Sequence, residues 1–282
     1  MTEDTITGMS AIDIGAAIKD GRLTSFEAAK AFLDAIEAKD REYHSYITVC
    51  REEALEQARE ADRAIASGEL KGVLAGVPVA IKDNICTRGI KTTCASKMLS
   101  DFVPPYDATV VRRIKEAGMV ILGKTNMDEF AMGSTTETSY FGPTINPWGH
   151  SRVPGGSSGG SAASVAGRLA PLSIGSDTGG SIRQPASFCG VTGLKPTYGS
   201  VSRYGLVAFA SSLDQIGPIG RDVMDVAAMF NVISGIDERD QSSVNSRKID
   251  MEHLAGYSVK GRKIGIPEQY FGEGIDSGVK EC

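Results

Sequence analysis

Apolar residues recur at helical spacing through the first seventy residues of the chain. Thr24 and Glu27 have the spacing of a capping box, in which a threonine and a glutamate satisfy the backbone at the start of a helix. The pattern predicts three helices, of which the last is charge-rich and has little apolar face: 10–19, 24–38 and 51–67. We expect residues 1–70 to form a helical region packed against a main body, residues 71–282.

From residue 76 onward the pattern changes to short apolar runs rich in β-branched residues, which are typical of buried strands. These runs predict strands over 76–84, 119–122, 169–174, 191–194 and 263–266. Helical patterns lie among them, and Asp107 is expected to cap the first of these helices: 107–117, 161–167, 181–188 and 222–234. The alternation predicts an α/β fold with a central sheet flanked by helices.

Two glycine-rich segments, 155–160 and 178–181, each place a serine directly after paired glycines. The second follows a predicted strand, so its backbone N–H groups can point into one small volume and form an oxyanion hole. A flexible linker is the alternative, but charged residues and apolar runs interrupt the glycines. Asp177 and Arg183 flank Ser181, and we expect them to form an ion pair that fixes this loop.

Two short motifs suggest other chemistries. Residues 118–125, GMVILGKT, match the phosphate-binding loop GxxxxGK[ST], but their middle positions are apolar enough to be a strand that ends in a surface lysine, Lys124. Residues 155–159 match GxSxG, the nucleophile elbow of α/β-hydrolases, which requires a later histidine. Only His253 follows Ser157, and it lies in a polar segment. We therefore favour neither an ATP site nor a hydrolase elbow.

The chain supplies a lysine where histidines are scarce. Its three histidines, His44, His150 and His253, lie far apart and lack metal-binding spacing, so each is expected to be a surface or capping residue. Lys82 ends an apolar run at the carboxyl end of a predicted strand, where open α/β sheets place their active sites. Burial lowers the pKa of a lysine, which can then act as a base for a serine, with a second serine relaying the proton. A surface lysine beside Asp83 is the alternative.

Composition narrows the class of protein. The chain has 282 residues, of which 41% are hydrophobic and 23% charged, and its net charge of −5 is spread along the sequence. These values are typical of a globular domain and give no sign of a nucleic-acid surface of its own. Five cysteines form no CxxC pair, which favours a reducing cytoplasm. The first residues lack the features of a signal peptide, and no apolar run is long enough for a membrane span.

Four segments together resemble the amidase signature family: 76–84, 152–161, 175–185 and 188–196. The resemblance implies the amidase-signature fold, with a mixed sheet, and a Ser-Ser-Lys triad. Ser181 would be the nucleophile, Ser157 the relay serine on a cis peptide after Gly156, and Lys82 the base. The backbone N–H groups of Thr178, Gly179 and Gly180 would hold the oxyanion, and no metal is implied.

Two more segments, 130–137 and 198–218, resemble the members of that family that serve tRNA-dependent amidation. This resemblance implies hydrolysis of glutamine without a cofactor of the chain's own. The ammonia would pass to a partner subunit that binds the tRNA and uses ATP and Mg²⁺, with a small third subunit completing a heterotrimer. The location would be the cytoplasm or, in a eukaryote, an organellar matrix, although no transit peptide is seen.

Family members continue beyond Cys282, so we expect the chain to be an N-terminal portion whose catalytic core is incomplete. Residues 275–282 fit this expectation, because they look like a helix start with no helix after it. Two other functions stay open: a stand-alone amidase, and a truncated, non-catalytic subunit that docks partners.

Overall fold

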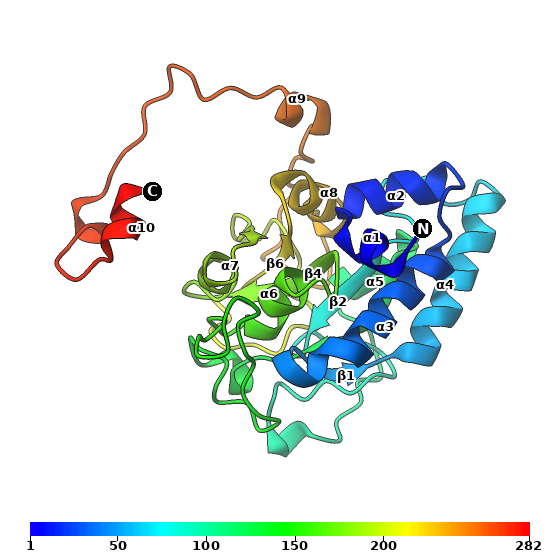
Figure 1. Cartoon of the computed structure of the whole chain (residues 1–282), viewed down its shortest axis with the longest axis horizontal. Helices are drawn as coiled ribbons and strands as arrows, with labels where there is room; N and C mark the ends of the chain where they lie inside the picture. The colour runs from blue at the N-terminus through cyan, green and yellow to red at the C-terminus, as the bar shows by residue number, and fades with distance from the viewer.

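A six-stranded mixed sheet forms the centre of the computed structural model, which describes residues 1–282 (Figure 1). Its strands lie in the order β1-β3-β2-β4-β6-β5. β2 pairs in parallel with β3 and β4, and the other neighbours are antiparallel. The strands have these bounds: β1 Tyr46–Val49, β2 Pro78–Lys82, β3 Val120–Thr125, β4 Leu172–Asp177, β5 Thr192–Gly193 and β6 Gln215–Gly220. The predicted α/β fold with a mixed sheet is confirmed.

The chain also forms ten α-helices and three short 3₁₀ turns, most of which lie around this sheet. Helices α3 and α4 pack on each other and against β3, α6 crosses the middle strands, and α8 packs against β6. None of the helices combines the length and apolarity that a membrane span requires. Their bounds are α1 Glu3–Gly8, α2 Ala11–Lys19, α3 Ser25–Tyr43, α4 Arg51–Ala66, α5 Thr109–Glu116, α6 Gly159–Ala166, α7 Arg183–Phe188, α8 Val223–Ile233, α9 Met251–Ala255 and α10 Ser277–Glu281, with η1 Lys97–Leu99, η2 Glu129–Ala131 and η3 Glu268–Tyr270.

The three helices predicted near the N-terminus are present. The capping box is formed, since the backbone N–H of Glu27 donates to the Thr24 hydroxyl and the Glu27 carboxylate accepts from the Thr24 N–H. Helix α3 runs to Tyr43, beyond the predicted end, because its last turns are polar and face solvent, where no apolar periodicity marks them. Strand β1, which was not predicted, lies in this region and pairs with β3. The division of the chain at residue 70 stays a prediction.

The predicted surface lysine at the end of β3 is wrong, because Lys124 is fully buried. The strand continues through Thr125, and the loop that follows β2 covers its end. Lys124 Nζ donates to the Ile85 carbonyl at 2.9 Å and to Thr92 Oγ1 at 2.7 Å, and it lies 3.5 Å from the Asp83 carboxylate. The apolar positions of the GxxxxGKT match are therefore a strand, with no loop to cradle a phosphate.

Asp107 does not cap a helix as predicted. Helix α5 begins two residues later, after Ala108, and has no side-chain cap. The Asp107 carboxylate instead accepts from the Arg88 backbone N–H at 2.7 Å and from Lys115 Nζ at 2.8 Å. An aspartate before an apolar helix therefore ties the preceding loop to the helix in this chain.

The predicted strand over 263–266 is also wrong. Ile264 and Ile266 are 79% and 73% exposed, and no strand pairs with them. A strand needs a neighbour for its backbone hydrogen bonds, which the apolar pattern alone cannot supply. This segment belongs to a tail, residues 256–282, that extends away from the body after α9 (Figure 1).

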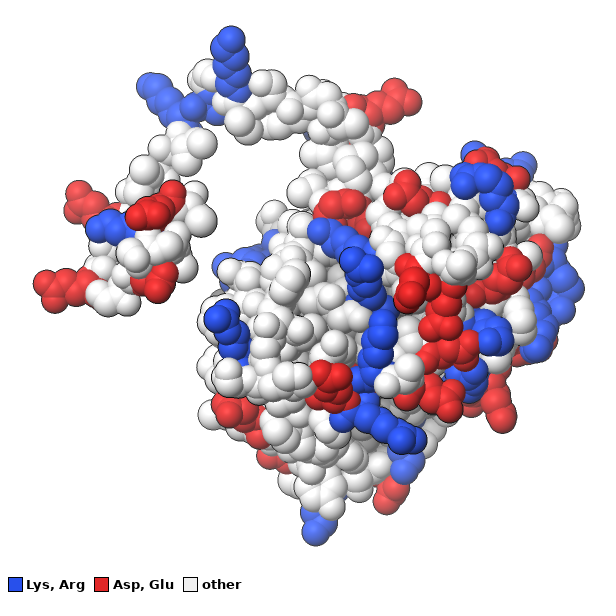
Figure 2. Space-filling view, viewed as in Figure 1, with Lys and Arg blue, Asp and Glu red and all other residues white.

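Acidic and basic side chains lie next to one another over much of the face shown in Figure 2, beside a broad area without charges. All five cysteines are free, and four of them are buried: Cys50, Cys86, Cys94 and Cys189. Cys282 is exposed. The sheet itself is closed to solvent, since all residues of β2, β3, β4 and β6 are buried. Polar side chains at the ends of these strands are therefore held away from water.

Candidate active site

Lys82 and Ser176 are brought together by two neighbouring parallel strands, β2 and β4. Ile81 pairs with Ile174, so both strands carry their last residues to the same edge of the sheet. Helix α6 crosses from β3 toward β4 and begins at Gly159, which places Ser157 and Ser158 at its start, over that edge. The carboxyl edge of parallel strands is where open α/β sheets assemble their sites.

The Lys82 ammonium is surrounded by serine oxygens. Its Nζ lies 2.7 Å from Ser157 Oγ, 2.9 Å from Ser158 Oγ and 3.0 Å from Ser176 Oγ. Asn84 Nδ2 also donates to Ser176 Oγ at 3.0 Å and so fixes that hydroxyl. Every one of these side chains is buried. The lysine is held in one position by neutral acceptors.

Burial lowers the pKa of Lys82 from 10.5 to about 7, because the ammonium has left water for the interior. Nearby acidic groups oppose this shift and keep the pKa from falling further: Asp128, Asp177, Cys94 and Asp214. A lysine with a pKa near 7 is partly uncharged at neutral pH. The lysine is buried at this strand end as the sequence predicted, and Ser157 is within reach as a proton donor, while its role as the base stays a prediction.

The Gly156–Ser157 peptide bond is cis, as the resemblance implied. Gly156 is closely packed, since a Cβ there would lie 2.0 Å from Asp128 Oδ2 and 2.8 Å from the Thr135 nitrogen. Its N–H donates to Gln184 Oε1 at 2.9 Å. The paired glycines before Ser157 are thus required by space, because any side chain at residue 156 would collide with backbone.

Ser181 lies beside this cluster but is not bonded to it through its side chain. Its carbonyl accepts from the Ser158 N–H at 3.1 Å, which brings the two glycine-framed segments together. Its side chain, in contrast to that of Ser157, is partly exposed and makes no hydrogen bond within the chain. The structure therefore joins Lys82 to Ser157 directly and places Ser181 next to them with a free hydroxyl.

The predicted ion pair between Asp177 and Arg183 is confirmed. Arg183 donates through both Nε and Nη2, at 3.1 and 3.0 Å, to the two carboxylate oxygens of Asp177. The same carboxylate accepts from the backbone N–H groups of Gly180 and Ile182. Although burial opposes it, this set of donors lowers the pKa of Asp177. The side chain therefore holds the turn around Ser181.

The glycine turn before Ser181 presents unused backbone donors. The N–H groups of Thr178, Gly179 and Ser181 donate to no acceptor within the chain, whereas that of Gly180 is directed to Asp177 at 2.8 Å. Unused N–H groups beside a free hydroxyl are what an oxyanion hole requires. The oxyanion role of Thr178, Gly179 and Gly180 stays a prediction.

A hollow of about 280 Å³ opens onto this turn. The sequence did not predict that the segment 131–134 would form its opposite wall: the resemblance covers residues 130–137 but assigns them no role in the site. Half of the lining comes from the two glycine-framed segments, and glycines leave room close to the backbone. The residues around it are Ala131, Gly133, Ser134, Gly156, Thr178, Gly179, Gly180, Ser181, Gln184 and Phe209.

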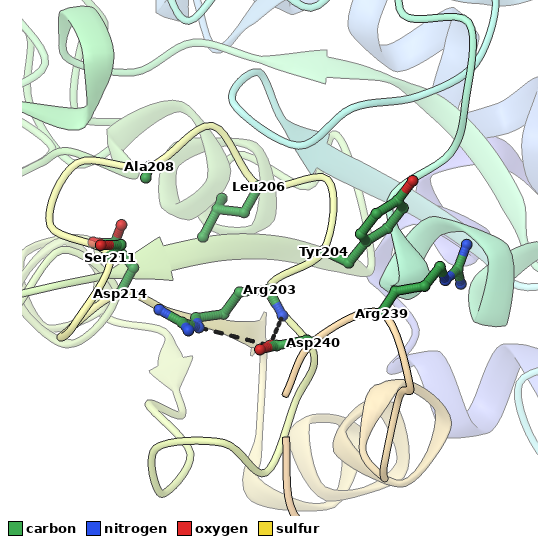
Figure 3. Close-up of a pocket in the computed structure, with 8 residues that line it drawn as sticks. All are labelled: Arg203, Tyr204, Leu206, Ala208, Ser211, Asp214, Arg239 and Asp240. Atoms are coloured by element: carbon green, nitrogen blue, oxygen red, sulfur yellow. Dashed lines mark hydrogen bonds and ion pairs between the residues drawn. The ribbon is translucent and has the colours of Figure 1, made fainter. Parts of the chain in front are cut away.

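A second hollow, of about 230 Å³, lies on the loop 203–214 (Figure 3). Figure 3 shows Arg203 turned toward Asp240, with which it forms an ion pair at 3.6 Å. Asp214 lines this hollow and also accepts from the Thr178 hydroxyl, so the loop contacts the glycine turn. The first hollow holds the free hydroxyl of Ser181 and the unused N–H groups beside it, next to the bonded pair of Lys82 and Ser157, so we assign the chemistry to the first hollow.

Histidines take no part in the site. His44 ends α3 in a left-handed conformation, as expected of a capping residue, and His150 pairs with Glu42 at the surface, 2.8 Å away. His253 lies in α9, where its backbone N–H donates to Asp250. The Ser157 hydroxyl bonds to Lys82 and to no histidine, which removes the basis for a hydrolase elbow. No three acidic, cysteine or histidine side chains are arranged to hold a metal ion.

Sequence reasoning missed Ser158, Ser176 and Asn84. Each bonds to the lysine or to its acceptors. Ser176 is the second-last residue of the buried strand β4, and a polar residue at the carboxyl end of such a strand is a signal that can be read. Ser158 stands beside Ser157, and no spacing rule distinguishes the two.

A model of the family described as Amidase matches residues 27–282, which is most of the chain. The chain belongs to the amidase family. Two curated relatives of this amidase-family chain, from Lachnoclostridium phytofermentans and Carboxydothermus hydrogenoformans, are each 60% identical to it. Both are named as the A subunit of glutamyl-tRNA(Gln) amidotransferase. The matches cover 98% and 97% of this chain and 56% of each relative, so the chain spans about half the length of the curated relatives it matches.

Two solved amidase-family structures share the fold. The crystal structure of the A subunit of glutamyl-tRNA(Gln) amidotransferase from Thermotoga maritima is 47% identical, with a TM-score of 0.74 over 86% of this chain and 50% of that one. The peptide amidase from Stenotrophomonas maltophilia is 39% identical, with a TM-score of 0.81 over 86% of this chain and 51% of that one. The amidase-signature fold predicted from the sequence is thus confirmed.

Proposed function

We propose that this chain is the glutamine-hydrolysing part of the A subunit of a glutamyl-tRNA(Gln) amidotransferase. The buried contact between Lys82 Nζ and Ser157 Oγ, next to the free hydroxyl of Ser181, carries the proposal, because it supplies a base, a relay and a nucleophile without histidine or metal. Identity of 60% to two proteins of that name supports the choice of glutamine.

The reaction begins when Ser181 Oγ attacks the side-chain amide carbon of glutamine. Its proton passes to Ser157 Oγ, whose own proton passes to Lys82 Nζ. The carbonyl oxygen becomes an oxyanion, for which the backbone N–H groups of Thr178, Gly179 and Ser181 are free, whereas that of Gly180 is held by Asp177. The carbon–nitrogen bond then breaks as Lys82 returns a proton to the departing ammonia. Water hydrolyses the glutamyl ester on Ser181 by the same proton route and releases glutamate.

The ammonia would serve a complex. In this proposal a partner, the B subunit, binds the tRNA and uses ATP and Mg²⁺ to convert Glu-tRNA(Gln) to Gln-tRNA(Gln). A small third partner, the C subunit, completes the heterotrimer, which acts as a carbon–nitrogen ligase in the cytoplasm. The chain itself would hold no cofactor. The face shown in Figure 2 mixes acidic and basic side chains, which is compatible with leaving the tRNA to the partner.

Ammonia release from glutamine tests the proposal, measured with the chain alone and with the B and C subunits. Ser181→Ala is expected to abolish turnover and Lys82→Ala to reduce it by several orders of magnitude. Ser164→Ala is the matched control, since Ser164 is a buried serine of α6 whose hydroxyl donates to the Ser161 carbonyl. Full turnover by Lys82→Ala would contradict the proton relay.

A stand-alone amidase is the second candidate, supported by the likeness to the Stenotrophomonas peptide amidase. Such an enzyme would release ammonia from a peptide amide without partners and would prefer it to glutamine. A docking protein without turnover would bind the B and C subunits and release no ammonia from either substrate. The same assay therefore separates all three functions.

A further inference from the structure

Asp128 is a buried carboxylate that the proposed reaction does not yet use. It follows β3 by three residues and is fully buried. Its backbone N–H donates to the carbonyl of Ser157 at 3.3 Å, and its Oδ1 accepts from Thr138 Oγ1 at 3.0 Å. Its other oxygen, Oδ2, has no hydrogen-bond partner. A buried carboxylate oxygen that accepts no hydrogen bond lowers the stability of the folded chain, so we expect this carboxylate to have a function.

Two glycines hold this carboxylate against the relay serine. A Cβ on Gly156 would lie 2.0 Å from Asp128 Oδ2, and a Cβ on Gly133 would lie 2.3 Å from its Cγ. Both glycines line the hollow at Ser181. The carboxylate therefore packs between Gly133 and Gly156, in contact with the peptide that precedes Ser157.

The carboxylates of Asp128, Asp177 and Asp214 favour the protonated form of Lys82, as the Cys94 thiol does. The charge of Asp177 is neutralised by Arg183, whose side chain is about half exposed to solvent. Asp214 accepts from the Thr178 hydroxyl and from backbone N–H groups of the loop 203–214. Asp128 alone lacks both a cation and a full set of donors, so its charge is the least compensated of the three.

We propose that Asp128 is the counter-charge that stabilises Lys82 when the lysine carries the proton taken from Ser181 through Ser157. The lysine has no carboxylate within ion-pair distance, so the cation formed at this step would otherwise face only neutral oxygens. Asp128 is thus a positioning residue that acts through Lys82. This inference rests on the proposed base role of Lys82, and it does not require glutamine as the substrate.

Covalent labelling of Ser181 by an alkyl fluorophosphonate tests the proposal across pH. In that reaction a bond forms from Ser181 Oγ to phosphorus, the phosphorus–fluorine bond breaks, fluoride leaves, and the serine proton passes through Ser157 to Lys82. The wild-type rate is expected to rise with pH as Lys82 loses its proton. In Asp128→Asn the rise is expected about one pH unit lower or more, because the neutral variant no longer stabilises the cation. Its plateau rate falls, because the lysine is a weaker base.

Two further variants keep the test decisive. Asp128→Ser removes the same charge with a smaller side chain that leaves no amide group unpaired, and it is expected to show the same downward shift. Thr138→Val removes the hydroxyl that bonds to Oδ1 but keeps the charge. The rise of its labelling rate with pH, called the limb below, is therefore expected at the wild-type pH or at a higher pH. An unchanged limb in the neutral variants, or a downward shift in Thr138→Val, would overturn the proposal.

The outcome is separable from the proposed substrate. If the labelling limb shifts as expected while glutamine releases no ammonia, the counter-charge stands and the glutaminase assignment fails. If ammonia is released but the limb of the neutral variants matches the wild type, the glutaminase assignment stands and the counter-charge role of Asp128 fails. Circular dichroism of each variant at pH 7 confirms that the chains compared are folded.

Discussion

Lys82 Nζ lies 2.7 Å from Ser157 Oγ, and neither side chain is exposed to solvent. The lysine is delivered by β2 and the serine by the segment before α6, so the contact spans 75 positions of the chain. A short contact between an amine and a hydroxyl in the interior lets a proton move without exchange with bulk water. The predictions below start from this pair.

The first prediction concerns Lys82 and stability. The folded chain releases the Lys82 proton near pH 7 and the unfolded chain near 10.5, so the unfolded state binds more protons between these values. The wild type should therefore become more stable relative to Lys82→Met as pH rises from 7 to 10.5, by on the order of a few kcal/mol. Urea unfolding of both proteins across this window measures the difference. A constant difference would mean that Lys82 has the same pKa in the folded and unfolded chains.

The second prediction concerns the close packing of Gly156. Gly156→Ala is expected to cost more than about 2 kcal/mol of unfolding free energy, because its Cβ would collide with Asp128 and with the backbone of Thr135. Gly179→Ala is the matched control for stability, since a Cβ there meets nothing within 4 Å. Thermal unfolding of the two variants gives the comparison. Equal melting temperatures would contradict the packing described here.

The third prediction concerns the loop that Asp177 holds. Arg183→Ala leaves the buried carboxylate with backbone donors only, and we expect a loss of about 1 kcal/mol together with slower labelling of Ser181. Arg22→Ala is the control, because its pair with Asp20 is exposed on both sides. If labelling stayed at the wild-type rate in Arg183→Ala, the ion pair would not fix the loop.

The fourth prediction concerns Ser176. Ser176→Ala removes an acceptor of Lys82 and frees Asn84, so we expect the lysine to lose its position and kcat to fall about tenfold or more with KM little changed. The comparison is again Ser164→Ala, which should keep both constants. A change confined to KM would place Ser176 in substrate binding instead.

The main elements of the site could be predicted because each has a local signature. Lys82 ends an apolar run, and Ser157 and Ser181 each follow paired glycines. Close packing at Gly156 and a positive φ at Gly180 account for one glycine of each pair. The capping box at Thr24 was likewise readable, since its donors and acceptors lie within four residues. Local patterns succeed where the interaction they describe is also local.

Other features could not be predicted because they depend on which distant segments cover a residue or pair with a strand. Lys124 looks like a surface residue in sequence, yet the loop containing Ile85 and Thr92 folds over it and supplies acceptors. Strand β6, QIGPIG, was missed because glycine and proline conceal its pattern, although its neighbours β4 and β5 complete its pairing. The converse error at 263–266 has the same cause, since no neighbour exists there to pair with it.

The distribution of cysteines has a practical consequence. Burial raises the pKa of the thiols of Cys50, Cys86, Cys94 and Cys189, which makes each a slow nucleophile, whereas Cys282 is open to solvent. A maleimide dye should therefore attach at one place, at the far end of the tail, without any engineered substitution. Fluorescence anisotropy of that dye would report binding of other subunits while the serine cluster stays chemically untouched.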